Sequence, residues 1–285
     1  MSDFTLVPPE GSITDTAGNV WSLGAPVVHG QELLRNGVQF ASGQGVLLLY
    51  FGQNVYTEND LGQWYVASAS DWQSVPGDPR QTSVSGIDVS HYQGNVDWAK
   101  VKASGQSFVF VKATESNDYT DDRFADNWTG AKAAGLLRGA YHFYRFAASP
   151  QSQADRFLVA LNGDLGELPI VVDVEDGATS LSSIGDLRQF LDVIQQRTGK
   201  RCIIYTGNWY WTSQRWGGSV PWARDHDLWI ADYRNPPPSC PSDWPAWKFW
   251  QYSSSGTVSG ISVAVDLNYF NGTNLDLQTY ANRAG

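Results

Sequence analysis

The chain has 285 residues, long enough for one barrel-sized domain with a small additional domain, or for two ordinary domains. Hydrophobic residues make up 42% and charged residues 17%, a composition typical of a folded globular protein rather than a disordered one. The formal net charge of −10 excludes nucleic-acid binding through a basic surface.

The first 75 residues predict a small all-β module. Asn36-Gly37 is a strong hairpin-turn dipeptide, whereas only residues 31–35 suggest a helical turn. The aromatic residues of this part either stack on sugar rings or form the core of a domain with few other apolar side chains, so a glycan-binding or docking role stays open. They are Tyr56, Trp64, Tyr65 and Trp72. The β-type runs are residues 19–23, 45–50, 54–58 and 63–66.

A linker is predicted at residues 76–83, because Pro76, Gly77 and Pro79 interrupt regular structure there. At the N-terminus, Met1 to Leu6 provide neither a basic nor an apolar region, so no standard signal peptide is expected. No run approaches the roughly 18 apolar residues that cross a bilayer, and we expect no membrane span.

Residues 84–285 alternate between strand-like and helix-like patterns. Near-continuous apolar runs such as Pro169-Ile170-Val171-Val172 fit parallel strands that are buried on both faces. This alternation predicts an α/β fold with a closed, irregular barrel, and a doubly wound sheet is the less favoured alternative. Eight strands are expected at residues 84–90, 107–113, 138–144, 168–175, 201–206, 227–231, 246–252 and 262–266. Helices are expected at residues 97–104, 122–134, 150–162 and 184–198.

Four acidic residues lie at the carboxyl ends of predicted strands: Asp88, Asp173, Glu175 and Asp266. In a β/α barrel this end carries the active site. Asp173 and Glu175 are two residues apart on one strand, which points both to one face with Cα atoms about 6.6 Å apart. Two like charges this close raise one pKa, as a proton donor at neutral pH requires. The alternative, that the acids cap helices or bind loop amides, is less favoured for four matching positions than for one.

Other catalytic devices are not evident. There is no Gly-x-Ser-x-Gly elbow, no His-Glu-x-x-His motif and no phosphate-binding loop, so we expect neither a metal nor a cofactor. His142 is expected to be structural or to contact substrate, and the other histidines give no signal. Cys202 and Cys240 permit one disulfide, and the sequence fits a bridge and two free thiols equally.

Several stretches of residues 84–275 resemble the family 25 glycoside hydrolases, the lysozymes of Chalaropsis type, in the family's order and spacing. The matching stretches are residues 86–94 (GIDVSHYQG), 96–98 (VDW), 108–115 (FVFVKATE), 139–143 (GAYHF), 173–175 (DVE), 228–231 (LWIA), 250–253 (WQYS) and 265–268 (VDLN). The N-terminal module departs from the family pattern, since many relatives carry C-terminal wall-binding repeats instead.

The resemblance implies a barrel of eight strands and about five helices. It also implies hydrolysis of the β-1,4 bond from N-acetylmuramic acid to N-acetylglucosamine in peptidoglycan. By motif, Glu175 would be the acid/base, Asp173 would orient and stabilise the substrate's N-acetyl group, and Asp88 and Asp266 would complete the acidic floor. The family favours retention through the substrate's own acetamide, while a direct Asp nucleophile stays open.

Further residues near the strand ends are expected to line the sugar cleft. They are Lys112, Tyr141, Tyr205, Tyr233 and Trp250.

Two rival interpretations require acids in other positions or numbers. A chitinase-type barrel needs an Asp-x-x-Asp-x-Asp-x-Glu run, which Leu168 and Val171 break. A non-catalytic glycan-binding protein on the same barrel would be favoured by a lost acid, and all four acids are present. We therefore expect a monomeric lysozyme whose partner is bacterial peptidoglycan. It would act in the cell wall or periplasm after lysis, delivery by a phage or secretion apparatus, or export without a standard signal.

Overall fold

The computed structural model divides into two compact units, residues 1–82 with 272–276 and residues 83–271 with 277–285. The residues that the structure describes are 5–8, 10–51, 53–75, 78–79, 83–177, 181–233 and 238–284.

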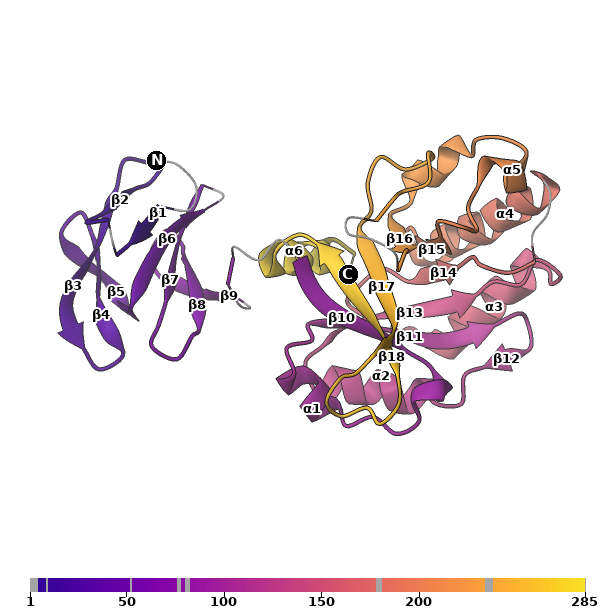
Figure 1. Cartoon of the computed structure of the whole chain (residues 1–285), viewed down its shortest axis with the longest axis horizontal. Helices are drawn as coiled ribbons and strands as arrows, with labels where there is room; N and C mark the ends of the chain where they lie inside the picture. Colours follow the sequence, from indigo (N-terminus) through magenta and orange to yellow (C-terminus); the bar gives the residue numbers. More distant parts are fainter. Residues whose placement is uncertain are drawn as a thin grey trace. The chain divides into compact units, whose positions relative to one another are not determined.

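The N-terminal unit consists of two antiparallel sheets (Figure 1). One has the order β1 (Thr5–Val7), β6 (Leu47–Phe51), β7 (Asn54–Glu58), β8 (Trp64–Ala67) and β9 (Trp72–Val75). The other has the order β2 (Ile13–Thr14), β3 (Val20–Val27), β4 (Gly30–Arg35) and β5 (Val38–Gly45). Side chains of both sheets, including those of Trp21, Leu33, Phe40, Leu48 and Tyr50, share one buried core.

The predicted hairpin at Asn36-Gly37 is confirmed, because these residues join β4 to β5 with φ angles of 55° and 79°. Positive φ at both central residues matches the right-handed twist of the flanking strands. The helical turn suggested for residues 31–35 is wrong. These residues form β4, where Leu33 is fully buried between β3 and β5, so tertiary pairing overrides the local pattern.

The predicted linker falls mostly outside the described residues, since Pro76 and Gly77 are among those left undescribed. Strand β9 ends at Val75 and the first barrel strand begins at Ser83.

Eight strands of the second unit close into a barrel, as predicted. In ring order they are β10 (Ser83–Val89), β11 (Phe108–Glu115), β13 (Leu137–Phe143), β14 (Val171–Asp173), β15 (Ile203–Gly207), β16 (Leu228–Ala231), β17 (Phe249–Gly256) and β18 (Val265–Asn271). Strand β10 pairs with both β11 and β18, which completes the ring. A short strand, β12 (Tyr119–Thr120), is added beside β11.

One barrel strand runs against all the others. Strand β18 is antiparallel to both of its neighbours, β17 and β10, whereas the other neighbouring barrel strands are parallel. The sequence predicts a strand that ends at Asp266, but β18 begins at Val265. Because β18 is reversed, its first residues lie at the end of the barrel where the parallel strands finish.

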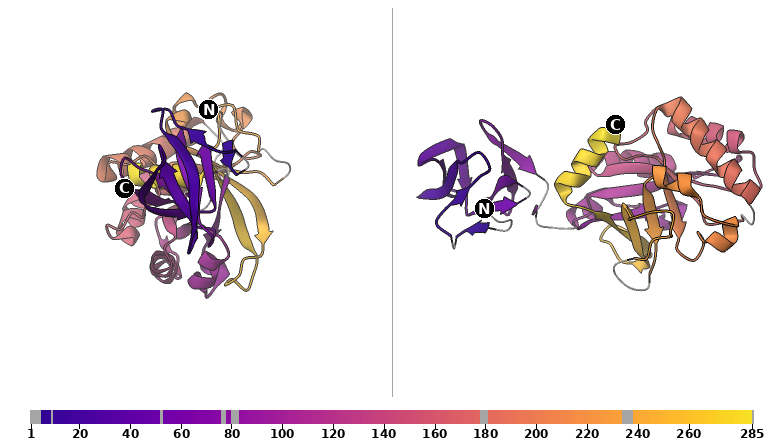
Figure 2. Two further views of the ribbon diagram at one scale, coloured as in Figure 1. Left: turned by 90° about the vertical axis from the view of Figure 1, so that its left-hand side faces the viewer. Right: turned by 90° about the horizontal axis from the view of Figure 1, so that it is seen from above.

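Helices lie outside the ring of strands (Figures 1 and 2). The four predicted helices are present as α1 (Trp98–Ala103), α2 (Phe124–Ala133), α3 (Pro150–Leu161) and α4 (Leu181–Thr198). The sequence did not predict α5 (Ser213–Trp216), α6 (Asn274–Ala284) or the 3-10 turns at His91–Gln93 and Pro221–Asp225. Within the described part of the chain, no helix combines the length and apolarity needed to cross a bilayer.

Two apolar clusters hold the barrel together. Inside the ring, Phe108, Phe110, Trp229 and Phe249 pack on one another, with Phe110 and Trp229 stacked at 4.4 Å between ring centroids. The larger cluster lies between strands and helices. Filling the interior with aromatic rings closes the barrel below its mouth, so polar groups can gather only at the strand ends. Cys202 and Cys240 are both free thiols.

Candidate active site

A pocket of about 280 Å³ opens at the mouth of the barrel. All four predicted acids line it, as do Lys112, Tyr141 and Tyr205. The sequence did not single out several other lining residues, among them Ser90, Tyr92, Phe143, Trp229, Gln251 and Ala264.

Asp88 and Asp266 are direct partners on the antiparallel strands β10 and β18. Asp88 Oδ2 accepts hydrogen bonds from Asn268 Nδ2 at 2.7 Å and from Gln251 Nε2 at 2.9 Å. Gln251 Nε2 also donates to Asp266 Oδ2 at 3.2 Å. Burial, followed by the charge of Asp266, raises the pKa of Asp88 well above its usual value, and burial also raises the pKa of Asp266.

The orientation of Gln251 is fixed by two phenols. Tyr205 donates to Gln251 Oε1 at 2.9 Å and Tyr233 donates to the same oxygen at 2.6 Å. With its oxygen occupied in this way, the amide must direct its NH₂ group toward the carboxylates. Asn268 is set in the same manner, because Trp229 Nε1 donates to Asn268 Oδ1 at 2.8 Å.

Asp173 and Glu175 form the other half of the acidic floor. Strand β14 ends at Asp173, so Glu175 lies two residues beyond the strand rather than on it. Tyr205 O still accepts a hydrogen bond from Val174 N at 2.9 Å, which continues the extended backbone past the strand end. Both acids therefore remain in the pocket, with the buried Val174 between them on the other face.

Desolvation dominates the chemistry of these two acids. Asp173 is only 6% exposed, and burial together with the nearby charge of Glu175 raises its pKa well above the ordinary value. Burial, and then the charge of Asp266, raises the pKa of Glu175. Asp173 Oδ1 is buried and has no hydrogen-bond partner among the described residues. A buried oxygen left unpaired in this way is available to a ligand.

Lys112 supplies positive charge beside this pair. Its side chain is 9% exposed, and Nζ lies 2.7 Å from Glu115 Oε2. Glu115 Oε1 is also held by Arg145, at 2.9 Å from Nε and 2.6 Å from Nη2. The charge of Lys112 lowers the pKa of both Asp173 and Glu175, against the larger effect of burial.

The predicted cleft residues do not all meet. Lys112, Tyr141 and Tyr205 line the pocket, and Tyr233, which is 44% exposed, reaches Gln251 beside it. Trp250 does not line the pocket, contrary to expectation. It packs in the cluster between strands and helices and donates from Nε1 to Asp232 O at 2.8 Å. Phe249, Trp250 and Gln251 alternate regularly between the barrel interior and the helix side, because the register shift of β17 comes only after Gln251.

Sequence reasoning missed the two amides that hold Asp88. Gln251 lies in the WQYS stretch and Asn268 in the VDLN stretch, so both were visible as parts of motifs. Because their side chains are neutral, neither residue by itself indicates a catalytic role. Their importance depends on Asp88, from which Asn268 is 180 residues distant in the chain.

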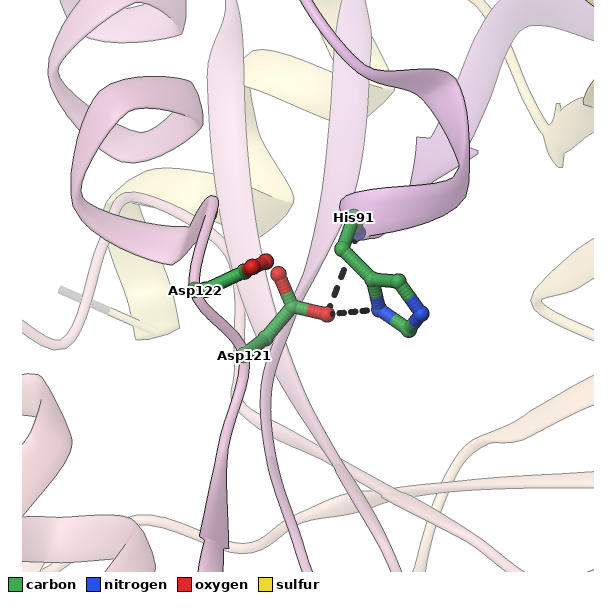
Figure 3. A group of neighbouring side chains, drawn as sticks. All are labelled: His91, Asp121 and Asp122. Atoms are coloured by element: carbon green, nitrogen blue, oxygen red, sulfur yellow. Dashed lines mark hydrogen bonds and ion pairs between the residues drawn. The ribbon is translucent and has the colours of Figure 1, made fainter.

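One group of potential metal ligands was found among the described residues, at His91, Asp121 and Asp122 (Figure 3). Asp121 Oδ2 accepts hydrogen bonds from His91 N at 3.1 Å and lies 2.8 Å from His91 Nδ1. Asp121 Oδ1 accepts from Arg123 N at 3.0 Å. Both oxygens are thus used to join the turn after β10 to the start of α2, which accounts for the cluster without an ion.

His142 is structural rather than a substrate contact. It is fully buried, with Nδ1 at 2.7 Å from Thr114 Oγ1 and Nε2 at 3.1 Å from Gln153 Oε1. Burial lowers the pKa of His142 to about 4, so the ring is neutral at physiological pH.

The comparisons with known proteins agree on one family. A model described as glycosyl hydrolases family 25 matches residues 87–261. Lysozyme M1 of Streptomyces globisporus is 38% identical over 249 residues, which cover 82% of this chain and 81% of that protein. An N,O-diacetylmuramidase of a Chalaropsis species is 30% identical and covers 67% of this chain. The crystal structure of a bacterial lysozyme from Streptomyces coelicolor has a TM-score of 0.64 and 39% identity, covering 71% of this chain and 98% of its own.

Proposed function

Since this chain belongs to family 25 of the glycosyl hydrolases, we propose that it is a lysozyme that cleaves the β-1,4 bond between N-acetylmuramic acid and N-acetylglucosamine in peptidoglycan. The observation that carries the proposal is the pair of acids at the carboxyl end of β14, one buried and one half-buried. Asp173 and Glu175 line the mouth pocket together, and Asp173 retains one unpaired buried oxygen.

Glu175 is the proton donor in this proposal. Cleavage of a glycosidic bond requires a proton on the leaving oxygen, and a carboxyl group supplies it at neutral pH only if its pKa is raised. Burial raises the pKa of Glu175 in that direction. Glu175 is also less buried than Asp173, so its carboxyl group is the more accessible of the two to the bond that breaks.

Asp173 is the residue that orients the substrate's acetamide. Its Oδ1 can accept a hydrogen bond from the acetamide N–H, because no described residue occupies that oxygen. Accepting this bond places the acetamide oxygen to attack the anomeric carbon as the leaving sugar departs, and stabilises the positive charge on the cyclic intermediate. Water then opens the intermediate with Glu175 acting as base, which retains the anomeric configuration.

Asp88 and Asp266 complete the floor of the pocket. Their raised pKa values mean that this pair holds a proton more readily than free carboxyls do. The pair therefore presents a hydrogen-bonding surface of reduced negative charge to the sugar, fixed by Gln251 and Asn268.

Every residue that lines the mouth pocket lies between Asp88 and Asp266 of one chain, so we propose that a monomer is catalytically complete and that residues 84–285 form the catalytic barrel. The site of action is the bacterial cell wall, reached by release on lysis, by delivery or by export.

Product analysis tests this function. Purified cell walls are digested, and the new reducing ends are labelled and identified. The proposal expects N-acetylmuramic acid at every new reducing end and loss of turbidity in the wall suspension. New N-acetylglucosamine reducing ends would contradict it, as would binding of walls with no cleavage, which is the behaviour of a glycan-binding protein.

A further inference from the structure

The N-terminal unit contains a cavity of its own, with a volume of about 340 Å³. Residues of both sheets line it. Leu33 comes from β4, Gln44 from β5, Thr57 from β7, Tyr65 from β8 and Trp72 from β9. The catalytic proposal uses none of these residues.

An aromatic ring with an unused donor forms part of the wall. Trp72 is half-buried, and its indole is held edge-on by Trp21 and Phe40, at 5.5 Å and 5.8 Å between ring centroids. Gly43 lies directly against the ring, since a Cβ at that position would collide with the indole nitrogen. That nitrogen, Nε1, is buried and has no hydrogen-bond partner among the described residues. Trp72 is therefore a fixed surface with a free N–H.

Two amide groups add further donors. Gln63 Oε1 accepts from Asn59 Nδ2 at 2.9 Å and from Tyr65 Oη at 3.2 Å. Gln44 Oε1 accepts from His29 N at 3.1 Å. With both carbonyl oxygens occupied, the NH₂ groups of these two lining residues remain as donors without a partner in the described part of the chain.

The loop between β7 and β8 is preformed. Asn59 Oδ1 accepts from Leu61 N at 3.1 Å and from Gln63 N at 2.9 Å, and Gly62 N donates to Asn59 O at 3.1 Å. This holds Leu61 at the cavity, where the residue is 67% exposed and offers an apolar surface to a ligand. Among the described residues, the ionisable groups of the lining are the Tyr65 phenol, His29 and Asp71, and none of them is a lysine or arginine, so the lining suits an uncharged ligand.

We propose that this cavity is a second carbohydrate site, which binds an N-acetylated sugar unit of the wall glycan. The flat apolar face of a pyranose ring stacks on Trp72 and Tyr65. Its hydroxyl and acetamide oxygens accept from the indole and the two amides, and the acetamide methyl packs on Leu61. The choice of the wall glycan rests on the proposed lysozyme function.

Such a site raises the effective concentration of substrate at the catalytic pocket, because one bound sugar keeps the chain on the wall between cleavage events. Hydrolysis of short soluble fragments would gain nothing from it.

The sequence placed four aromatic residues of this module in a possible sugar surface, but Tyr56 and Trp64 are 3% exposed and belong to the core. The cavity therefore uses the other two.

The test measures binding of the full-length chain to sacculi from which the stem peptides have been removed. Glu175→Gln is present throughout to prevent digestion, and binding is read from the fraction that sediments with the walls. Tyr65→Ala should raise the apparent Kd on the order of tenfold, as loss of an aromatic contact residue does. Trp72→Phe keeps a ring but removes the N–H, and should raise the apparent Kd about threefold. Gln73→Ala, an exposed residue of β9 that does not line the cavity, is the matched control and should bind like the parent.

Wild-type affinity in both Tyr65→Ala and Trp72→Phe would overturn the proposal. So would binding that needs the stem peptides, because the ligand would then be a peptide. The same substitutions in a chain with Glu175 intact should leave hydrolysis of soluble glycan fragments unchanged. If the unmutated chain did not hydrolyse soluble glycan fragments, the lysozyme proposal would be refuted. Binding to peptide-free glycan that depends on Tyr65 and Trp72 would still support the second carbohydrate site.

Discussion

Asp88 and Asp266 face each other as direct partners on strands β10 and β18, and one amide nitrogen, Gln251 Nε2, donates to both carboxylates. The two acids come from opposite ends of the barrel sequence and meet because the ring closes between these strands. Burial disfavours the charged form of a carboxyl group and therefore raises the pKa of both residues. The charge of Asp266 raises the pKa of Asp88 further.

Glu175→Gln should lower the rate of wall hydrolysis by roughly 10²–10⁴-fold, because general acid help is lost while the side chain keeps its shape. Asp173→Asn should be severely impaired as well, and Asp88→Asn and Asp266→Asn less so, since the acids act as a unit. Initial rates on cell walls provide the measurement, with circular dichroism as the control for folding. A folded Glu175→Gln enzyme that keeps more than about a tenth of the activity would contradict the assignment.

Lys112→Met should move the alkaline limb of the pH profile to higher pH. Glu175 works only while protonated, so activity falls as pH rises through its raised pKa. Lys112 lowers the pKa of both Glu175 and Asp173, and its removal must therefore raise them. The profile of kcat/KM against pH reports the free enzyme. Lys100→Met, which removes an exposed lysine paired with Asp97, is the control and should leave the limb in place. A shift to lower pH would show that the sign is wrong.

Asp88→Asn should flatten the dependence of stability on pH. The folded-state pKa of Asp88 is raised above its unfolded value, so its stabilising contribution is complete below the unfolded pKa and is lost as pH rises toward the folded one. For this group the free energy of unfolding then falls by up to about 1.4 kcal/mol per pH unit in that window. Chemical denaturation of both proteins at several pH values from about 4 to 7 measures the difference. Parallel curves would refute a raised pKa at Asp88.

Trp250→Phe should leave the catalytic rate unchanged. The ring lies between strands and helices, outside the pocket, and its indole bonds Asp232 O. Loss of that hydrogen bond should reduce the free energy of unfolding by about 1 kcal/mol. Thermal unfolding and initial rates are measured on the same sample. A large fall in kcat with unchanged stability would return Trp250 to the substrate cleft.

Deleting residues 1–80 should preserve cleavage of small soluble glycan fragments, because every residue of the mouth pocket lies later in the chain. Action on whole walls should weaken if the N-terminal module holds the enzyme on its substrate. The two substrates are compared in parallel. Equal loss on both would mean that the module is needed for the barrel to fold, and no loss on either would remove wall binding as its role.

The sequence was a good guide to the order of the strands and to the four acids. Long apolar runs such as that before Asp173 have few alternatives to a buried strand, and an acid at the end of such a run is conspicuous. The direction of β18 was not predictable, because an antiparallel strand reads the same as a parallel one along the chain. Trp250 was misplaced because the sequence does not say which of two alternating residues faces the barrel interior, and in β17 Gln251 faces it and Trp250 does not.

Gln251 and Asn268 could not be identified as site residues from the sequence for a different reason. An amide gains its role only from what surrounds it, and here the surroundings are Asp88 and two phenols brought in by the fold. The donors of the N-terminal cavity could not be predicted for the same reason, because they depend on which amide oxygens already accept hydrogen bonds in the folded chain.

The reversed closing strand has a consequence for synthesis. A chain leaving the ribosome contains Asp173 and Glu175 long before it contains Gln251, Asp266 and Asn268. Asn268, which donates a hydrogen bond to Asp88, lies 180 residues later in the chain. The pairing of β10 with β18 joins the barrel strands that are most distant in sequence, and it must form last. A nascent or C-terminally truncated chain therefore carries its proton donor but not the floor of its pocket. Hydrolytic activity should appear abruptly, only when the chain up to residue 271 has left the ribosome and the ring can close.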